Sequence, residues 1–136
     1  MSSISAIALS GLNAASLRLQ VSASNVANAG STGALPNANG TVPAGSPQAY
    51  APLEVVQSAS VGGGVQTSVT TVTPSTTAVF DPQASFANQD GLVAAPNVDL
   101  ASEFVGQLLA SYSYAANAIV LKADDRMTQS LLDITA

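Results

Sequence analysis

The stretch that decides the fold lies near the C-terminus and reads Glu103-Phe104-Val105-Gly106-Gln107-Leu108-Leu109-Ala110-Ser111-Tyr112. It belongs to the segment 97–136, which contains no proline. Apolar residues recur along this segment in steps of three or four, and this spacing places them on one face of an α-helix. They include Val105, Leu108, Tyr112, Ile119, Met127 and Leu131. The sequence therefore predicts one amphipathic helix of roughly 55 Å, with Asn97 as its N-terminal cap.

A second apolar stripe lies at the opposite terminus, between Ser3 and Asn28. Its members also follow each other in helical steps, and its larger residues are Ile4, Leu12, Leu19 and Val26, with Leu9 beside them. Asn25, Asn28 and Gly30 are residues that end helices readily, so the helix is expected to stop there. A long apolar stripe needs an equally long partner. We therefore expect the two terminal helices to pair as an antiparallel, coiled-coil-like hairpin.

The middle of the chain changes character twice. Residues 29–52 carry four prolines among Gly, Ser, Thr and Asn, which predicts an extended arm that is either disordered or held by a neighbouring molecule. Residues 53–60 and 65–73 are rich in Val and Thr and flank Gly62-Gly63-Gly64, which predicts a β-hairpin. Residues 79–96 show no strong period and are interpreted as turns that lead back to the long helix.

These patterns together predict a mainly α fold. Two long terminal helices pair, and a small β-hairpin and an extended arm are inserted between them. The expected division is an N-terminal helix in 1–30, the arm, hairpin and turns in 31–96, and a C-terminal helix in 97–136.

Composition excludes several classes of function. Three Lys and Arg stand against eight Asp and Glu, and this balance argues against nucleic-acid binding. The chain has no histidine or cysteine, and Asp81, Asp90 and Asp99 are explained by turns and capping, so we expect no enzyme, no cofactor, no metal site and no small-molecule substrate. Large core side chains are scarce and charge is sparse. We infer that the isolated monomer is only marginally stable and that contacts with other subunits stabilise it.

Several motifs resemble those of the bacterial flagellar basal-body rod family, and most closely its proximal rod members. The N-terminal match is Leu9-Ser10-Gly11-Leu12-Asn13-Ala14-Ala15, then Ser24-Asn25-Val26-Ala27-Asn28 and Ser31-Thr32-Gly33. The C-terminal match includes Tyr114-Ala115-Ala116-Asn117-Ala118 and Leu131-Leu132-Asp133-Ile134. The segment Ala87-Asn88-Gln89-Asp90-Gly91-Leu92-Val93-Ala94-Ala95-Pro96-Asn97-Val98 resembles the part that distinguishes the proximal rod subgroup. The family motif thus falls on Asn25, Asn28, Gly33, Asp90, Gly91, Pro96 and Asn97.

The chain departs from the family pattern at three positions next to these residues. Ser24 replaces the first asparagine of a usual pair, Ala34 replaces an aromatic residue, and Leu92 replaces a frequent tyrosine. The departures bear on particular contacts of the arm.

The resemblance implies a non-enzymatic structural subunit in the basal-body rod that spans the periplasm. Such a subunit is exported unfolded by the flagellar type III apparatus and assembles helically with copies of itself and other rod proteins. The assembly forms the drive shaft and encloses the export channel. Alternatives are another axial subunit of the flagellum, of the distal-rod or hook type, and a soluble helical-hairpin binding module. A cell-wall-cutting enzyme would need a paired acid and base, for which the chain offers little.

The larger apolar residues of the two stripes are the candidates for the helix core and subunit interface. They are Leu9, Leu12, Leu19, Val26, Val105, Leu108, Tyr112, Ile119, Met127 and Leu131. On this hypothesis Leu12→Asp abolishes assembly, and normal motility of a strain that carries the change would contradict it.

Overall fold

The computed structural model describes residues 3–37 and 39–135 and consists of two long helices joined through two β-hairpins. Helix α1 spans Ser3–Asn28 and helix α2 spans Leu100–Thr135. The strands are β1 (Leu53–Ala59), β2 (Val65–Thr71), β3 (Thr76–Phe80) and β4 (Leu92–Pro96). The expected mainly α fold, with small antiparallel strand pairs between two terminal helices, is therefore confirmed. Residues 1, 2, 38 and 136 of the predicted three-part division lie outside the described residues.

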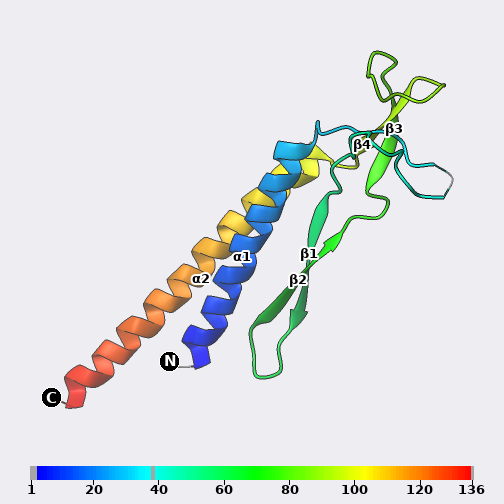
Figure 1. Ribbon diagram of the computed structural model, residues 1–136. Helices are drawn as coiled ribbons and strands as arrows, with labels where there is room; N and C mark the ends of the chain where they lie inside the picture. Colours follow the sequence, from blue (N-terminus) through cyan, green and yellow to red (C-terminus); the bar gives the residue numbers. More distant parts are fainter. Residues whose placement is uncertain (1–2, 38, 136) are drawn as a thin grey trace.

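The two helices lie side by side and run in opposite directions (Figure 1). Near the start of α1, the Ser5 hydroxyl donates a hydrogen bond to Asp124 of α2. Near its end, the Asn25 amide donates to the Glu103 carboxylate at 2.6 Å. Helix α2 has 36 residues and α1 has 26, so α2 continues beyond the start of α1, toward the end of the molecule where both termini lie.

The hairpin β1–β2 forms where the Val- and Thr-rich runs predicted it. Its register pairs Leu53 with Thr71 at the open end and Ala59 with Val65 next to the turn. Gly62, Gly63 and Gly64 all have positive φ, between 83° and 104°, a conformation that glycine adopts without steric cost. Figure 1 shows the hairpin running alongside α1.

A second hairpin, β3–β4, occupies the segment interpreted as turns. Strand β3 pairs antiparallel with β4, from Thr76 opposite Pro96 to Phe80 opposite Leu92. The interpretation missed this pairing because the two strands have only five residues each and are separated by a turn-rich loop. The hairpin lies near the end of the helix pair where α1 finishes (Figure 1).

The described residues of the arm, 29–37 and 39–52, pack on their own chain, so the expectation of a disordered or neighbour-bound arm is corrected for them. Gly33 and Ala94 exchange two backbone hydrogen bonds, of 2.9 and 2.8 Å, which add the arm to the edge of β4. The arm also turns back on itself, since the Ala34 N–H donates to Pro47 and the Tyr50 N–H to Ser31. These bonds satisfy backbone groups that neither helix nor sheet would otherwise satisfy.

The start of α2 differs from the expectation by three residues. Asp99, and not Asn97, caps the helix: its Oδ1 accepts the Ala101 N–H at 2.9 Å and its Oδ2 accepts the Ser102 hydroxyl at 2.9 Å. Hydrogen bonds from the Ser102 hydroxyl and from the Ser102 and Ala101 N–H groups hold the pKa of the Asp99 carboxyl below its usual range. Asn97 instead donates its side-chain amide to the Pro74 carbonyl at 2.9 Å.

Candidate assembly surface

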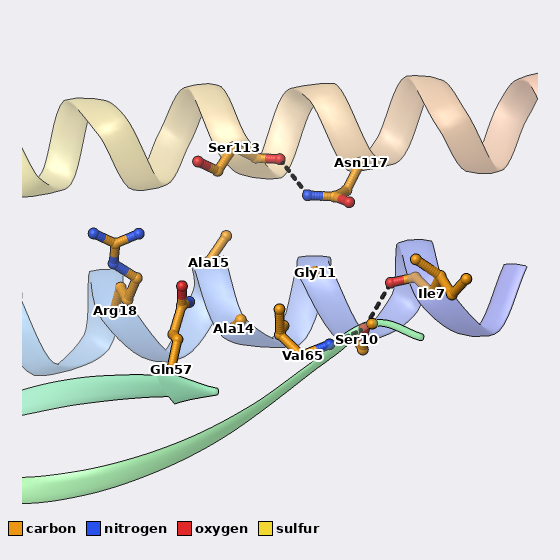
Figure 2. Close-up of a pocket in the computed structure, with 11 residues that line it drawn as sticks. Ile7, Ser10, Gly11, Ala14, Ala15, Arg18, Gln57, Val65, Ser113 and Asn117 are labelled. Atoms are coloured by element: carbon orange, nitrogen blue, oxygen red, sulfur yellow. Dashed lines mark hydrogen bonds between the residues drawn. The ribbon is translucent and has the colours of Figure 1, made fainter. Parts of the chain in front are cut away.

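The contact between the two helices is made by small and polar side chains. Ala8, Ala15 and Ser22 of α1 are buried, as is Ala110 of α2. Gly11 faces Asn117 so closely that a Cβ placed on the glycine would lie 2.6 Å from the Asn117 Cγ. Figure 2 shows Asn117 of α2 above Gly11 of α1. Small residues of this kind let the two backbones approach each other, and they leave no room for large side chains.

The large apolar stripe of α2 faces away from α1. Leu108 and Tyr112 each lie two residues from the buried Ala110, which is about 200° around a helix, so their side chains lie on nearly the opposite face from Ala110. The exposed fractions are 55% for Val105, 60% for Leu108, 73% for Tyr112 and 69% for Ile119. The expectation that these residues fill the contact between the two helices is therefore not met within one chain. They form an apolar outer face of α2, here defined as Val105, Leu108, Tyr112 and Ile119.

The other predicted interface residues differ in solvent exposure between the two helices. On α1, Leu12 and Val26 are half-buried, while Leu9 and Leu19 are exposed. On α2, Met127 and Leu131 are 52% and 66% exposed. These last two lie beyond Asp124, the residue that meets Ser5 near the start of α1, in a part of α2 that we call the overhang, residues 125–135.

A shallow apolar groove follows one side of the helix pair. Leu19 contributes from α1, and Phe104, Gln107, Leu108 and Ser111 contribute from α2, around a volume of about 370 Å³. A second hollow of about 380 Å³ continues it and is lined by Ala15, Leu19, Ala110 and Tyr114. Leu108 belongs to both the groove and the outer face, so the two join into one apolar surface.

Helix α2 is long and apolar enough to cross a membrane, by length and composition alone, over Leu100–Ile134. Only 6% of its most apolar window is buried inside the chain. Soluble monomers rarely expose contiguous apolar surfaces of this extent, and such surfaces mark sites of association. The helix therefore needs cover that a single chain does not supply.

The residues of the family motif serve the local structure and do not converge on one site. Asn28 donates to the Ser24 carbonyl in the last turn of α1, and Gly33 pairs with Ala94. Gly91, with φ of 73°, closes the loop between β3 and β4, where the Asp90 N–H donates to Asn88. Pro96 ends β4 and is buried, and the Asn97 side-chain amide donates a hydrogen bond to the Pro74 carbonyl.

Asn25 has a role that the sequence did not reveal. It was interpreted as a helix-ending residue, but it lies inside α1 and is only 2% exposed. Its side chain contacts Leu53, Tyr50 and Glu103, which come from β1, the arm and α2. A polar residue three positions before the helix end, within a mainly apolar helix, was the only local signal of this role. Within residues 3–37 and 39–135, no group of three or more acidic, His or Cys residues could hold a metal ion.

These features define the chain as a helical subunit with a long, exposed apolar helix. Residues 89–134 match the family model described as flagellar basal body rod FlgEFG protein C-terminal. The flagellar basal-body rod protein FlgC of Yersinia enterocolitica is 39% identical over 132 residues, which cover 93% of this chain and 88% of that protein. The FlgC proteins of Salmonella typhimurium and of Buchnera aphidicola subsp. Acyrthosiphon pisum are 35% and 34% identical, over 94% and 95% of this chain and 92% and 93% of theirs.

The chain belongs to the flagellar basal-body rod protein family, on the evidence of relatives that match it almost from end to end. It is a structural subunit of the rod, located in the flagellar basal body, and it is not an enzyme. The resemblance found in its motifs is therefore confirmed. The relatives that match its whole length are FlgC proteins, which agrees with the proximal rod subgroup.

Proposed function

We propose that this subunit assembles helically with copies of itself and with other rod proteins, and that the outer face of α2 is the surface that neighbours cover. The observation that carries the proposal is the exposure of Val105, Leu108, Tyr112 and Ile119 on the surface of α2. Burying a side chain of this size contributes about 1.5–3 kcal/mol. Four such side chains on one face supply enough apolar surface to favour association over the monomer.

The helix pair is proposed to act as a coiled-coil-like unit. On α1 the contact positions Ala8, Ala15 and Ser22 follow each other by seven residues. On α2 the positions Glu103, Ala110, Asn117 and Asp124 do the same. A repeat of seven in the contact positions is the pattern that keeps two helices in contact along their length. The antiparallel direction of the helices supports this assignment.

In the assembled rod, such units would form the wall of a tube, which acts as the drive shaft and encloses the export channel. A repeated head-to-tail contact between identical surfaces generates a helix and not a closed ring when the rotation does not close. Export through the flagellar type III apparatus in an unfolded state is part of the same proposal. The scarcity of large core residues supports it, because a marginally stable chain unfolds at little cost.

A charge on the outer face tests the proposal. Ile119→Asp is expected to leave the helix content of the purified chain unchanged, because the side chain is 69% exposed. In a strain that lacks the native gene, this variant is expected to give no rod in isolated basal bodies and no motility. Val61→Asp is the matched control, since Val61 is fully exposed at the turn of the β1–β2 hairpin. Complete rods and normal swimming with Ile119→Asp would contradict the proposal.

A further inference from the structure

The side chain of Asn25 uses all four of its hydrogen-bonding positions. Its amide nitrogen donates to the Leu53 carbonyl at 2.8 Å and to Glu103 Oε1 at 2.6 Å. Its oxygen accepts the Leu53 N–H and the Tyr50 hydroxyl, both at 3.0 Å. A side-chain amide offers two donors and two acceptor positions, so this group is fully satisfied although it is buried. The Asn25 side chain bonds both the backbone N–H and the backbone C=O of Leu53, as the backbone of a neighbouring strand would.

A second polar contact joins α1 to the other end of the same hairpin. The Ser10 hydroxyl donates to the Ile7 carbonyl at 2.7 Å and accepts the Val65 N–H at 3.1 Å, as Figure 2 shows. Gly64 precedes Val65, and a Cβ placed on it would lie 3.3 Å from the Ser10 Cβ. The glycine therefore lets the turn reach the helix at this point.

The two contacts match the length of the hairpin. Ser10 and Asn25 are 15 residues apart, which is about 22 Å along a helix and about 60° around it. Leu53 and Ala59 are the two ends of β1, and six steps along a strand cover about 20 Å. The hairpin is thus bonded to one side of α1 at both of its ends.

Apolar burial does little to hold the hairpin in place. In each strand only the first and third residues are half-buried, namely Leu53 and Val55 in β1 and Val65 and Thr67 in β2, and the other residues are exposed. An isolated two-stranded hairpin is marginal in water. Directional hydrogen bonds at its ends therefore have a large share in deciding its position.

We propose that Asn25 and Ser10 are positioning residues that form a two-point clamp and set the orientation of the β1–β2 hairpin on the helix pair. Asn25 fixes the base of the hairpin and couples it to α2 through Glu103, and Ser10 fixes the turn. The clamp makes the helices and the hairpin one rigid unit, so that the hairpin keeps a constant orientation relative to α1 and α2. This inference concerns the subunit alone and does not depend on how the subunit assembles.

The absence of cysteine from the chain allows a direct test with two spin labels. Val61→Cys places one label at the turn of the hairpin, and Ala101→Cys places the other at the exposed start of α2. Pulsed electron spin resonance then measures the distribution of distances between the labels, and far-ultraviolet circular dichroism measures helix content. The parent with both labels is expected to give one narrow distance distribution.

Asn25→Ala in this labelled chain is expected to remove the narrow distribution while helix content is retained. Ser10→Ala is expected to broaden it less, and the two changes together to broaden it most. Asn13→Ala is the matched control, because Asn13 is an exposed asparagine of the same helix, and it is expected to change nothing. A narrow distribution that survives Asn25→Ala would overturn the proposal, as would a broad one in the parent. Loss of helix content in step with loss of the distance would also overturn it, since Asn25 would then support the whole fold.

Discussion

Gly11 of α1 lies directly against the side chain of Asn117 on α2, with no space between them for a methyl group. Helix α2 also has a glycine, Gly106, which lines a hollow between α1 and β1, and a Cβ placed there would meet nothing within 4 Å. The two glycines thus have the same local effect on their helices, but only Gly11 is needed for the close contact between α1 and α2.

This pair gives the first prediction, which concerns stability. Gly106→Ala is expected to stabilise the chain by about 0.5–1 kcal/mol, because alanine favours the helix interior. Gly11→Ala gains the same helix propensity but forces the Asn117 side chain aside. Its free energy of unfolding is therefore expected to be no higher than that of the parent. The double change Gly11→Ala with Asn117→Ala is expected to be more stable than Gly11→Ala alone. Thermal unfolding followed by circular dichroism measures all three variants, and equal stabilisation by both single changes would contradict the assignment of the contact.

The second prediction concerns the arm. A Cβ on Gly33 would lie 2.6 Å from the Pro47 carbonyl oxygen, and closer still to the backbone of Gln48 and Ala49. Because backbone cannot rotate away, Gly33→Ala is expected to cost about 1–3 kcal/mol and to detach the arm from β4. The observable is hydrogen exchange at the Ala94 amide, which donates to Gly33 at 2.8 Å and should exchange faster in the variant. Gly30→Ala serves as the control, since a Cβ there meets nothing, and unchanged Ala94 protection in Gly33→Ala would disprove the docking.

Local patterns in the sequence were enough to predict the helices and the first hairpin. Residues four or seven apart lie on the same face of a helix, so the spacing of Leu108 and Tyr112, or of Leu12 and Leu19, carries the information directly. The hairpin β1–β2 is joined by a run of glycines and is equally local. Helix α1 begins and ends where its stripe predicted it, at Ser3 and Asn28.

Contacts between distant residues could not be predicted in the same way. The bond pair between Gly33 and Ala94 joins positions 61 residues apart, and the bonds from Asn25 to Leu53 and Glu103 depend on three elements meeting at one point. The stripes could be located from the sequence, but the sequence did not show which face of each helix packs within the chain. An apolar stripe shows that a face will be covered and does not show by which molecule. Here alanine and glycine pack within the chain, and the large residues remain outside.

The third prediction concerns the charge at the start of α2. Because hydrogen bonds lower the pKa of the Asp99 carboxyl in the folded chain, the ionised carboxylate stabilises the fold above its unfolded pKa of about 3.9. That contribution is lost as the pH falls through the lower folded pKa. Wild type is therefore expected to be more stable than Asp99→Asn at neutral pH, and the difference should close in acid. Unfolding curves over this pH range measure the difference in unfolding free energy between the two proteins. A difference independent of pH would show that ionisation of Asp99 does not contribute to stability.

The fourth prediction concerns the bond between Asn25 and Glu103. Asn25→Asp replaces a donor with a carboxylate beside the Glu103 carboxylate and leaves the Leu53 carbonyl without its partner. Each buried polar group left without a partner costs about 1–3 kcal/mol, and the repulsion adds to this, so Asn25→Asp is expected to be less stable than Asn25→Ala. Glu103→Gln restores a donor opposite Asp and is expected to recover part of the loss. A double-mutant cycle of unfolding free energies measures the coupling, and additive effects would show that the two side chains do not interact.

The fifth prediction concerns the overhang of α2. A chain that ends at Arg126 keeps the contact between Ser5 and Asp124, so its helix pair is expected to remain folded. It loses Met127, Leu131 and Ile134, whose side chains are 52%, 66% and 79% exposed and are not needed within the chain. If neighbouring subunits cover these residues, the shortened chain is expected to be folded but absent from isolated basal bodies, and the strain non-motile. The full-length chain with Gln129→Ala and Ser130→Ala, two exposed polar positions of the overhang, should assemble normally. Wild-type swimming with the shortened chain would show that the overhang is not part of the assembly surface, and would confine that surface to the outer face beside the helix pair.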